Sequence, residues 1–305
     1  MKTLIRRPLY TLAAPALRLL LRLSAALPLT WARALGRLVG HAAWLLNGRW
    51  RRITERNISL AYPMLGPGAS RELARDVLLQ GGMLVFEMGH VWHKPWSETQ
   101  RLILEVEGAE LVRAAKAEGR GVIVLGPHIG NWEVLGLHLS TLGDLVALFE
   151  PPRIAALGPI IKAARERAGG ELVPTTPRGL AALVKNVKAG GVSGILPDQV
   201  PDDESGGIDA PFMGLPAFSA TLAPNLIKRS GAVALMGAAY RIRGGFRVCY
   251  RPVSEAVYDS AAEMAVAAIN REVEKVIDGW DSQYVWQYKR FRSRTPGAAD
   301  RYLGV

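Results

Sequence analysis

The chain has 305 residues, of which 49% are apolar and 21% are charged. This composition is sufficient for one large domain or two small ones with a real core, and it excludes wholesale disorder. The single cysteine, Cys249, excludes an intramolecular disulfide framework and a zinc site built from several cysteines.

The net charge of +11 is concentrated at the beginning of the chain. Residues 1–56 contain eleven Lys or Arg and one acid, Glu55, which gives +10, so that the other 249 residues are nearly neutral at +1. A nucleic-acid-binding protein is expected to carry its positive charge on the folded domain that reads the ligand. A basic segment rich in Leu and Ala instead fits an anionic membrane surface, so we expect a membrane partner and no nucleic acid.

The same segment predicts two helices, over residues 9–25 and 31–47, that are separated at Pro28. We expect these amphipathic helices to lie on the membrane and to anchor a domain of residues 57–305. Two alternatives stay open at this point. Residues 8–31 could span the bilayer if Arg18 and Arg22 are tolerated, or the helices could pack on their own protein.

The rest of the chain predicts an α/β fold. A helix capped by Ser70 and ending near His90 is followed by helices that alternate with short apolar segments. Such alternation is typical of a mostly parallel central sheet flanked by helices. The expected strands are 103–108, 121–126, 144–151, 171–174, 191–198, 232–241 and 246–253, and the expected helices are 109–119, 131–143, 154–169, 178–189, 217–230 and 260–280.

Active sites of such sheets lie at the carboxyl ends of the strands, which draws attention to the loop after 121–126. There, His128 and Glu133 are five residues apart and can meet only if a helix begins between them. Asn131 is a good N-cap and Gly130 permits the bend before it. The spacing therefore predicts that Glu133, in the first helical turn, orients the His128 imidazole.

This pair suits the activation of a hydroxyl group. A histidine near neutral pH is the usual general base, and a carboxylate on its second nitrogen fixes the tautomer. No motif for a nucleophile of the protein itself accompanies it, so direct transfer to a substrate hydroxyl is the simpler interpretation. The pattern H-x4-E alone is weak, and an ordinary loop histidine beside a helix N-terminal acid would give the same letters.

Further segments extend the pattern beyond this pair. They are the basic apolar start, RNISLAYP (56–63), GPHIGNWE (126–133), IKAARERAGG (161–170), LPDQ (196–199), PFMGLPAFSATLAPNLIKRSGA (211–232) and YVWQYKRFRSR (284–294). Together they resemble the late acyltransferases of lipid A biosynthesis, the lauroyl/myristoyl acyltransferase family, and more broadly the lysophospholipid and glycerophosphate acyltransferases that share H-x4-D/E. The resemblance covers nearly the whole chain in the order of the family. It departs from the family's pattern at Phe212-Met213 and over Phe149–Arg153, and the second departure bears on the acceptor site.

The resemblance implies an O-acyltransferase with a glycerophosphate-acyltransferase-like fold on the cytoplasmic face of a bacterial inner membrane. It implies an acyl thioester donor, acyl carrier protein or acyl-CoA, an anionic lipid A precursor as acceptor, and no metal or redox cofactor. Acceptors of the lysophospholipid or ornithine-lipid type stay open, as does a lipid-binding protein without enzymatic activity.

The resemblance also implies roles for further residues. Arg165 or Arg167 would bind phosphate or stabilise an oxyanion, as would the backbone of Gly130 and Asn131 at a helix N-terminus. Asp198 would orient that arginine or bind the acceptor, and Arg290 would contact anionic groups of the acceptor. For each charged residue the alternative is an ordinary structural or solvated side chain. His90 and His93 lack a third ligand, so we expect no metal site.

Overall fold

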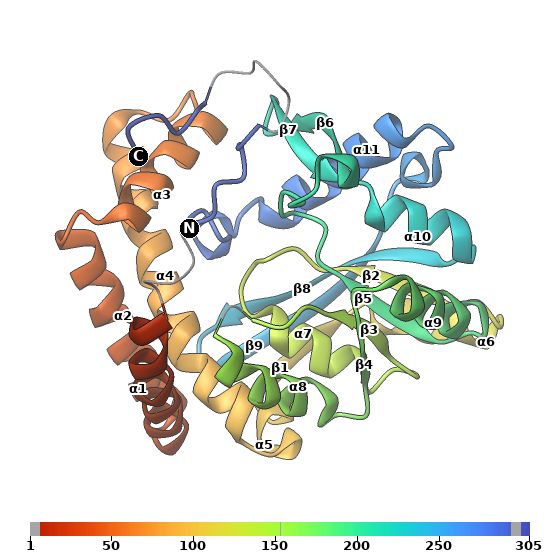
Figure 1. Ribbon diagram of the computed structural model, residues 1–305, viewed down its shortest axis with the longest axis horizontal. Helices are drawn as coiled ribbons and strands as arrows, with labels where there is room; N and C mark the ends of the chain where they lie inside the picture. The colour runs from red at the N-terminus through yellow and green to blue at the C-terminus, as the bar shows by residue number, and fades with distance from the viewer. Residues whose placement is uncertain (1–6, 153, 294–299) are drawn as a thin grey trace.

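The computed structural model describes residues 7–152, 154–293 and 300–305, with side chains from residue 15 onward. Expectations for residues 1–6, for residue 153 and for residues 294–299 lie outside this range. Four helices open the described chain and lie together on one side of the molecule (Figure 1). They are α1 (Arg7–Ala26), α2 (Leu29–Leu45), α3 (Arg49–Ala61) and α4 (Pro67–His93).

The two helices expected at the start are confirmed, with Pro28 as the residue that separates them. Helix α2 crosses α4 closely because glycines line the contact. A Cβ atom on Gly36 or Gly40 of α2, or on Gly82 of α4, would lie within 2.6 Å of a backbone oxygen of the other helix. Glycine therefore allows the two backbones to approach to a distance that any side chain would prevent.

The opposite face of α1 and α2 is apolar and exposed. Trp31 and Leu38 are 66% and 64% exposed, and their apolar neighbours on this face are Leu19, Leu23, Leu35, Val39, Leu45 and Leu46. Helix α2 thus packs on its own protein by its glycine face and leaves a bulky apolar face uncovered. No helix among the described residues is both long enough and apolar enough to cross a bilayer.

Two boundaries differ from expectation or stay untested. Helix α4 begins at Pro67, directly after its N-cap Gly66, and not at Ser70, because proline is well suited to the first position of a helix. Helix α3 runs through residue 56 without a break. The division into an anchoring segment of residues 1–56 and a catalytic domain of residues 57–305 stays a prediction.

The central sheet has the strand order β1-β9-β8-β2-β5, and all neighbours are parallel except the antiparallel pair β8–β9. The fold is therefore mixed α/β with a parallel-dominated sheet flanked by helices, as expected (Figure 1). The bounds are β1 (Ile103–Glu107), β2 (Val122–Leu125), β5 (Val192–Ile195), β8 (Val233–Ile242) and β9 (Gly245–Pro252).

A parallel pair, β3 (Val146–Phe149) and β4 (Glu171–Pro174), adjoins β5 through a bridge between Leu145 and Val192. The helices and short 3-10 turns that connect the strands are α5 (Trp96–Gln100), α6 (Ala109–Ala117), α7 (Trp132–Leu139), η1 (Ala155–Leu157), α8 (Gly158–Glu166), α9 (Pro177–Lys188), η2 (Glu204–Gly206), α10 (Leu222–Ser230), η3 (Glu255–Tyr258), α11 (Ala262–Ile277) and η4 (Asp281–Gln283).

One prediction of a helix was wrong at its start. The helix expected over 217–230 begins only at Leu222, because the preceding residues form a hairpin of β6 (Gly207–Phe212) and β7 (Leu215–Ala220). Met213 and Gly214 connect the two strands with φ angles of 50° and 74°, and such a two-residue turn matches the twist of antiparallel strands. The turn depends on this conformation, which a pattern of apolar residues does not reveal.

Strand β2 lies in the middle of the core and is buried on both faces, as parallel strands between helices usually are. Ile123 and Leu125 belong to the cluster under α9, α10 and α11, whereas Val122 and Val124 belong to the cluster under α6 and α7. This strand therefore holds the loop that follows it on a rigid base.

Candidate active site

His128 and Asp198 meet at the carboxyl end of the sheet. Strands β2 and β5 are parallel neighbours in which Leu125 pairs with Ile195, and each of the two site residues follows its strand's last residue by three positions. The Nδ1 atom of His128 lies 2.8 Å from Oδ1 of Asp198, and the backbone N–H of His128 donates to Oδ2 at 2.9 Å.

The Asp198 carboxylate is 1% exposed and ionised. Burial by itself would raise its pKa, but the His128 ring, the two hydrogen bonds from His128 and the charge of Arg290 together lower the pKa below its usual value. Burial and the Asp198 charge raise the pKa of Tyr284, whose phenol therefore stays protonated. An ionised carboxylate on Nδ1 keeps the proton of a neutral imidazole on that nitrogen.

The other ring nitrogen of His128 is thereby left as a base. Its Nε2 atom lies 3.1 Å from Nε2 of Gln199, whose amide donates and whose side chain is exposed. The His128 side chain is 13% exposed and packs edge-on against Trp132, with ring centroids 4.9 Å apart. The basic nitrogen thus faces a position that a substrate hydroxyl can take from Gln199.

The expected pairing of His128 with Glu133 is wrong. Both oxygens of Glu133 accept from Arg165, at 2.8 Å from Nε and 2.6 Å from Nη2, and the Glu133 side chain is 3% exposed. Helix α7 does begin between the two residues, but its first turn directs Glu133 toward α8, where the guanidinium compensates its charge. A role for Glu133 in catalysis stays a prediction. In this geometry Glu133 would act through Arg165.

The structure separates the two arginines at the end of α8, which the sequence left as alternatives. Arg165 is partly exposed beside Glu133, and its pKa is raised because the charge and hydrogen bonds of Glu133 outweigh burial. Arg167 donates to the carbonyl oxygens of Trp92, at 2.7 Å, and of Lys94. Arg167 therefore ties α8 to the end of α4. Its expected role in binding an oxyanion or phosphate stays a prediction.

The turn before α7 has the predicted form but not the predicted ligand. Asn131 caps α7 by accepting from the N–H of Val134, and Gly130 has a φ of 57° where a Cβ atom would lie 2.1 Å from the Ala239 oxygen. The N–H groups of Gly130 and Asn131 donate to the carbonyl oxygens of Gln283 and Ala239, at 3.1 and 2.8 Å. Since both amides are used inside the protein, they are not free for an oxyanion or phosphate, and that expectation is corrected.

Arg290 and Asp198 are also corrected as acceptor-binding residues. Arg290 is 1% exposed, and its guanidinium donates to Phe218 O, Ser219 Oγ and Asn270 Oδ1 at 2.7–3.1 Å. The positive charge of Arg290 instead helps to lower the pKa of Asp198. Asp198 itself is buried against His128, in the orienting position that the sequence predicted for Glu133.

An apolar pocket lies beside these groups. Glu133 and Arg165 are the charged residues of its lining, and Trp132, which contacts His128, also lines it. The rest of the lining is aliphatic or glycine and comes from β2, α7, β3, β4 and β5. These residues are Val124, Gly126, Leu135, Gly136, Leu139, Leu145, Ala147, Leu148, Leu172, Gly194, Ile195 and Leu196.

The arrangement can activate a hydroxyl beside a bound hydrocarbon chain. Asp198 and His128 have the geometry of two members of a catalytic triad, whose third member would be a hydroxyl group of the substrate. Arg165 has a free Nη1 group among its described contacts, which can stabilise negative charge in the pocket. Within the described ranges, no three His, Cys, Asp or Glu side chains lie close enough together to hold a metal ion.

Comparison with known proteins connects this geometry to a family. The model of the bacterial lipid A biosynthesis acyltransferases matches residues 2–293. The chain is 25% identical over 272 residues to the lipid A biosynthesis palmitoleoyltransferase of Escherichia coli K12, with 88% of this chain and 87% of that protein covered. It is 24% identical over 267 residues to the lauroyltransferase of the same organism, with 87% and 86% covered.

A lipid A biosynthesis acyltransferase of Haemophilus influenzae is 25% identical over 269 residues, with 86% of this chain and 81% of the relative covered. The match to the family model extends through His128, Glu133, Arg165, Asp198 and Arg290, and thus through the whole site. The chain therefore belongs to the bacterial lipid A biosynthesis acyltransferase family, and the protein is an acyltransferase.

Proposed function

We propose that the protein transfers a fatty acyl chain from acyl carrier protein to a hydroxyl group of a lipid A precursor at the cytoplasmic face of a bacterial inner membrane. The observation that carries this proposal is the Asp198–His128 pair, whose Nε2 atom contacts only the exposed Gln199 side chain among the described residues, and whose ring packs on Trp132 in the wall of an apolar pocket that Arg165 also lines. The family membership and the relatives' names support lipid A as the acceptor.

In the proposed reaction, His128 Nε2 takes the proton of the acceptor hydroxyl after that group replaces Gln199. The hydroxyl oxygen then attacks the thioester carbonyl, and Arg165 stabilises the tetrahedral oxyanion. The carbon–sulfur bond breaks, the ester remains on the lipid, and the thiolate receives the proton from His128. Asp198 stays ionised throughout and stabilises the imidazolium that forms transiently.

The apolar pocket is the proposed site of the acyl chain. Its lining removes the hydrocarbon from water, and each buried CH2 group contributes about 0.8 kcal/mol. Because Glu133 and Arg165 are the charged residues of the lining, we expect the polar thioester beside them and the methyl end among the leucines of α7 and β3.

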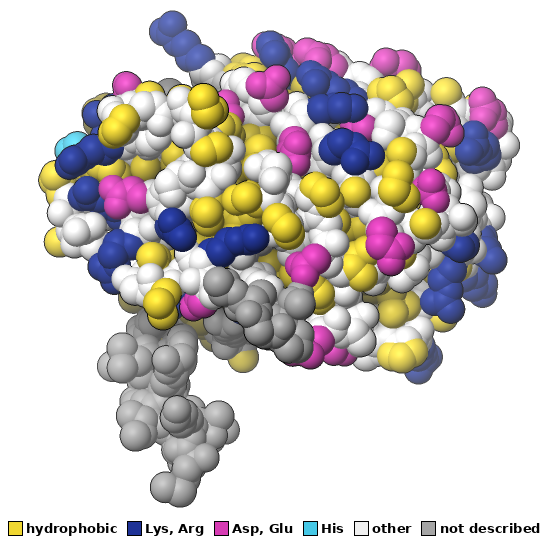
Figure 2. All heavy atoms as spheres, turned by 90° about the horizontal axis from the view of Figure 1, so that it is seen from above, with side chains coloured by type: hydrophobic (Ala, Val, Ile, Leu, Met, Phe, Trp, Pro, Cys, Tyr) yellow, Lys and Arg dark blue, Asp and Glu magenta, His cyan; other side chains and the backbone are white. Residues whose placement is uncertain are grey.

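The exposed apolar face of α1 and α2 supports docking on an anionic membrane. Arg22 and Arg37 are exposed among its apolar residues, and Arg49 and Arg52 are exposed at the start of α3. Figure 2 shows Lys and Arg side chains beside apolar ones along the side of the molecule that carries these helices. Aliphatic and basic side chains together suit the boundary between headgroups and acyl chains.

An acyl-transfer assay in membranes tests the proposal. Purified enzyme is given acyl carrier protein charged with a fatty acid and a lipid A precursor with a free hydroxyl, and products are identified by mass spectrometry. We expect acylation of the precursor by wild type and none by His128→Ala. Acylation of lysophospholipid or ornithine lipid in its place, or equal use of acyl-CoA, would contradict the proposed acceptor or donor respectively.

A further inference from the structure

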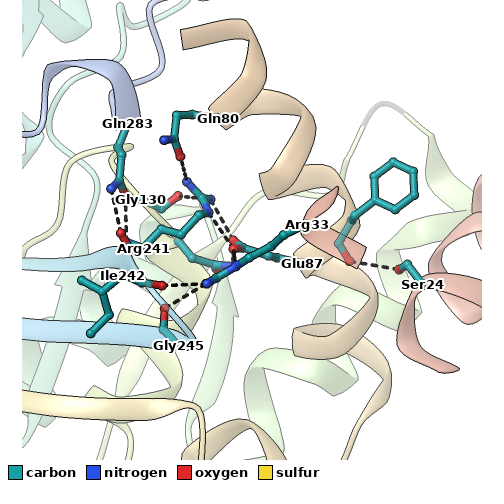
Figure 3. Close-up of polar contacts among 11 residues, drawn as sticks. Ser24, Arg33, Gln80, Glu87, Gly130, Arg241, Ile242, Gly245 and Gln283 are labelled. Atoms are coloured by element: carbon teal, nitrogen blue, oxygen red, sulfur yellow. Dashed lines mark hydrogen bonds and ion pairs between the residues drawn. The ribbon is translucent and has the colours of Figure 1, made fainter. Parts of the chain in front are cut away.

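Glu87 of α4 is a fully buried carboxylate that the proposed reaction does not use. It accepts from Arg33 at 2.6 Å and from Arg241 at 2.6 and 2.7 Å (Figure 3). It also accepts from the Asn131 side chain at 3.1 Å. Burial would raise the pKa of Glu87, but the charges and hydrogen bonds of Arg241 and Arg33 lower it below its usual value. The group is therefore an ionised centre to which three separate parts of the chain are tied.

One of these parts is the turn of the active site. Asn131 donates to Glu87 with Nδ2 while its Oδ1 caps α7, so that a single side chain connects the buried carboxylate to the helix that carries Glu133. In the preceding residue, Gly130, both the backbone N–H and the backbone oxygen have partners. Its N–H donates to the Gln283 carbonyl, and its oxygen lies 3.5 Å from Nη2 of Arg241.

Gln283 and Arg241 are themselves locked to each other. The Gln283 side chain accepts from the backbone N–H of Arg241 at 2.8 Å and donates to the Arg241 oxygen at 2.9 Å. The Arg241 guanidinium also donates to Gln80 at 2.6 Å. In Figure 3, the side chains of Gln80, Arg241 and Gln283 lie near Gly130, between α4 and the end of β8. The turn thus rests on a hydrogen-bonded frame of which Glu87 is the negative centre.

The third part is the N-terminal helix pair. Arg33 of α2 reaches Glu87 and also donates to the carbonyl oxygens of Ile242 and Gly245, at 2.7 and 2.8 Å, in the turn between β8 and β9. The helix whose outer face is exposed and apolar is therefore attached to the same carboxylate as the turn.

We propose that Glu87 is a positioning residue for acyl transfer, which acts through Asn131 to fix the turn that sets His128 and Glu133 in place. The proposal rests on the proposed function only for its kinetic readout. The distance in sequence is short on both sides: His128 precedes Gly130 by two residues, and Glu133 follows Asn131 by two. A displacement of this turn by about 1 Å is enough to lower a catalytic rate about a hundredfold.

Exchanging the carboxylate and the amide between Glu87 and Asn131 can distinguish a positioning role of Glu87 from a role in stability alone. Asn131→Asp keeps the cap, because Asp and Asn are equally good N-caps, but sets a second carboxylate against Glu87. Glu87→Gln removes the carboxylate to which Asn131 donates. The double variant Glu87→Gln/Asn131→Asp restores one negative charge for Arg33 and Arg241, and the amide introduced on α4 can donate to the carboxylate introduced at the cap.

We expect kcat to fall about tenfold or more in each single variant, with KM within about twofold, and to return within about threefold of wild type in the double variant. The proposal is overturned by an Asn131→Asp enzyme with the wild-type kcat, or by a double variant whose loss equals the product of the two single losses. Should a single variant fail to fold, the double variant decides alone, since its rate must be near that of wild type.

A second readout does not depend on the substrate. NMR of histidine-labelled protein, with the His128 ring signal assigned by its loss in His128→Gln, should show that signal shifted in each single variant and restored in the double variant. An unshifted signal in both single variants overturns the proposal. Failure of wild type to acylate the lipid would overturn the proposed function and leave this result standing.

Thr176→Asp is the matched control. Thr176 is the exposed N-cap of α9 and accepts from the N–H of Gly179, so the substitution also adds a carboxylate to a cap but has no Glu87 beside it. We expect wild-type kcat and an unchanged His128 signal. A loss equal to that of Asn131→Asp would overturn the proposal, because it would assign the effect to any new charge at a helix N-terminus.

Discussion

His128 and Asp198 each follow the end of a buried strand by three residues, and because β2 and β5 are paired in register the imidazole and the carboxylate meet at 2.8 Å. The sheet itself thus builds the proposed catalytic pair, with each partner on a separate loop at the same edge. Glu133 instead binds Arg165. The site therefore contains two pairs, the His128 imidazole with the Asp198 carboxylate and the Arg165 guanidinium with the Glu133 carboxylate.

Replacement of Arg165 by Lys should lower kcat about a hundredfold and change KM little. A lysine keeps the positive charge but cannot hold both oxygens of Glu133 while it donates to an oxyanion. Initial rates of acyl transfer at saturating lipid measure the effect. Lys162→Arg, an exposed change on the same helix, is the control, and an Arg165→Lys enzyme with the wild-type kcat would remove the oxyanion role.

Replacement of Gly136 by Leu should shift the enzyme toward shorter acyl chains. Gly136 lines the apolar pocket, and a Cβ atom there would have no neighbour within 4 Å, so a leucine would extend into space reserved for the substrate. Competition between donors of different chain length, analysed by mass spectrometry, measures the preference. Gly68→Leu, in open space at the start of α4, should leave it unchanged; an unaltered preference in Gly136→Leu would place the chain elsewhere.

Glu87 should make the free energy of unfolding depend on acid pH. Its folded pKa is lowered, so its stabilising effect is fully present above the unfolded pKa of about 4.3 and is lost as pH falls toward the folded pKa. The destabilisation by Glu87→Gln should therefore be largest at pH 7 and shrink below about pH 4. Urea unfolding of both proteins between pH 3 and pH 7 measures this difference, and a constant difference would contradict the assignment of an ionised Glu87.

The exposed face of α2 should determine membrane affinity. Trp31→Ser together with Leu38→Ser removes two of its most exposed apolar side chains and should weaken binding to anionic vesicles by about tenfold or more. Co-sedimentation with vesicles measures the change. Met264→Ser, on α11 and 51% exposed, is the control. Equal loss in the control, or no loss in the double variant, would assign membrane binding to another surface.

The sequence predicted the alternation of strands and helices because apolar periodicity and glycine boundaries are local signals. It also predicted the N-cap at Asn131 and the turn at Gly130, which depend on a few neighbouring residues. The hairpin β6–β7 was missed because its turn at Met213 and Gly214 depends on left-handed backbone conformations that apolar spacing does not encode.

The partner of His128 could not be read from its neighbours in sequence, because the pairing depends on which strand lies beside β2. Asp198 carried a signal nevertheless, since it stands at the carboxyl end of the expected strand 191–198, as His128 stands just after the expected strand 121–126. Glu87 carried none. It lies in an amphipathic helix more than forty residues before Asn131, and its burial between Arg33 and Arg241 arises only when α2, α4 and β8 are packed together.

The double-mutant cycle of His128→Gln and Asp198→Asn tests the central claim most directly. Rates of acyl transfer are measured for both single variants and the double variant, with Asp203→Asn on the exposed loop nearby as a control that should equal wild type. Because the two residues act as one unit, the double variant should be no slower than His128→Gln alone. Losses that multiply, or an Asp198→Asn enzyme as fast as wild type, would contradict the account.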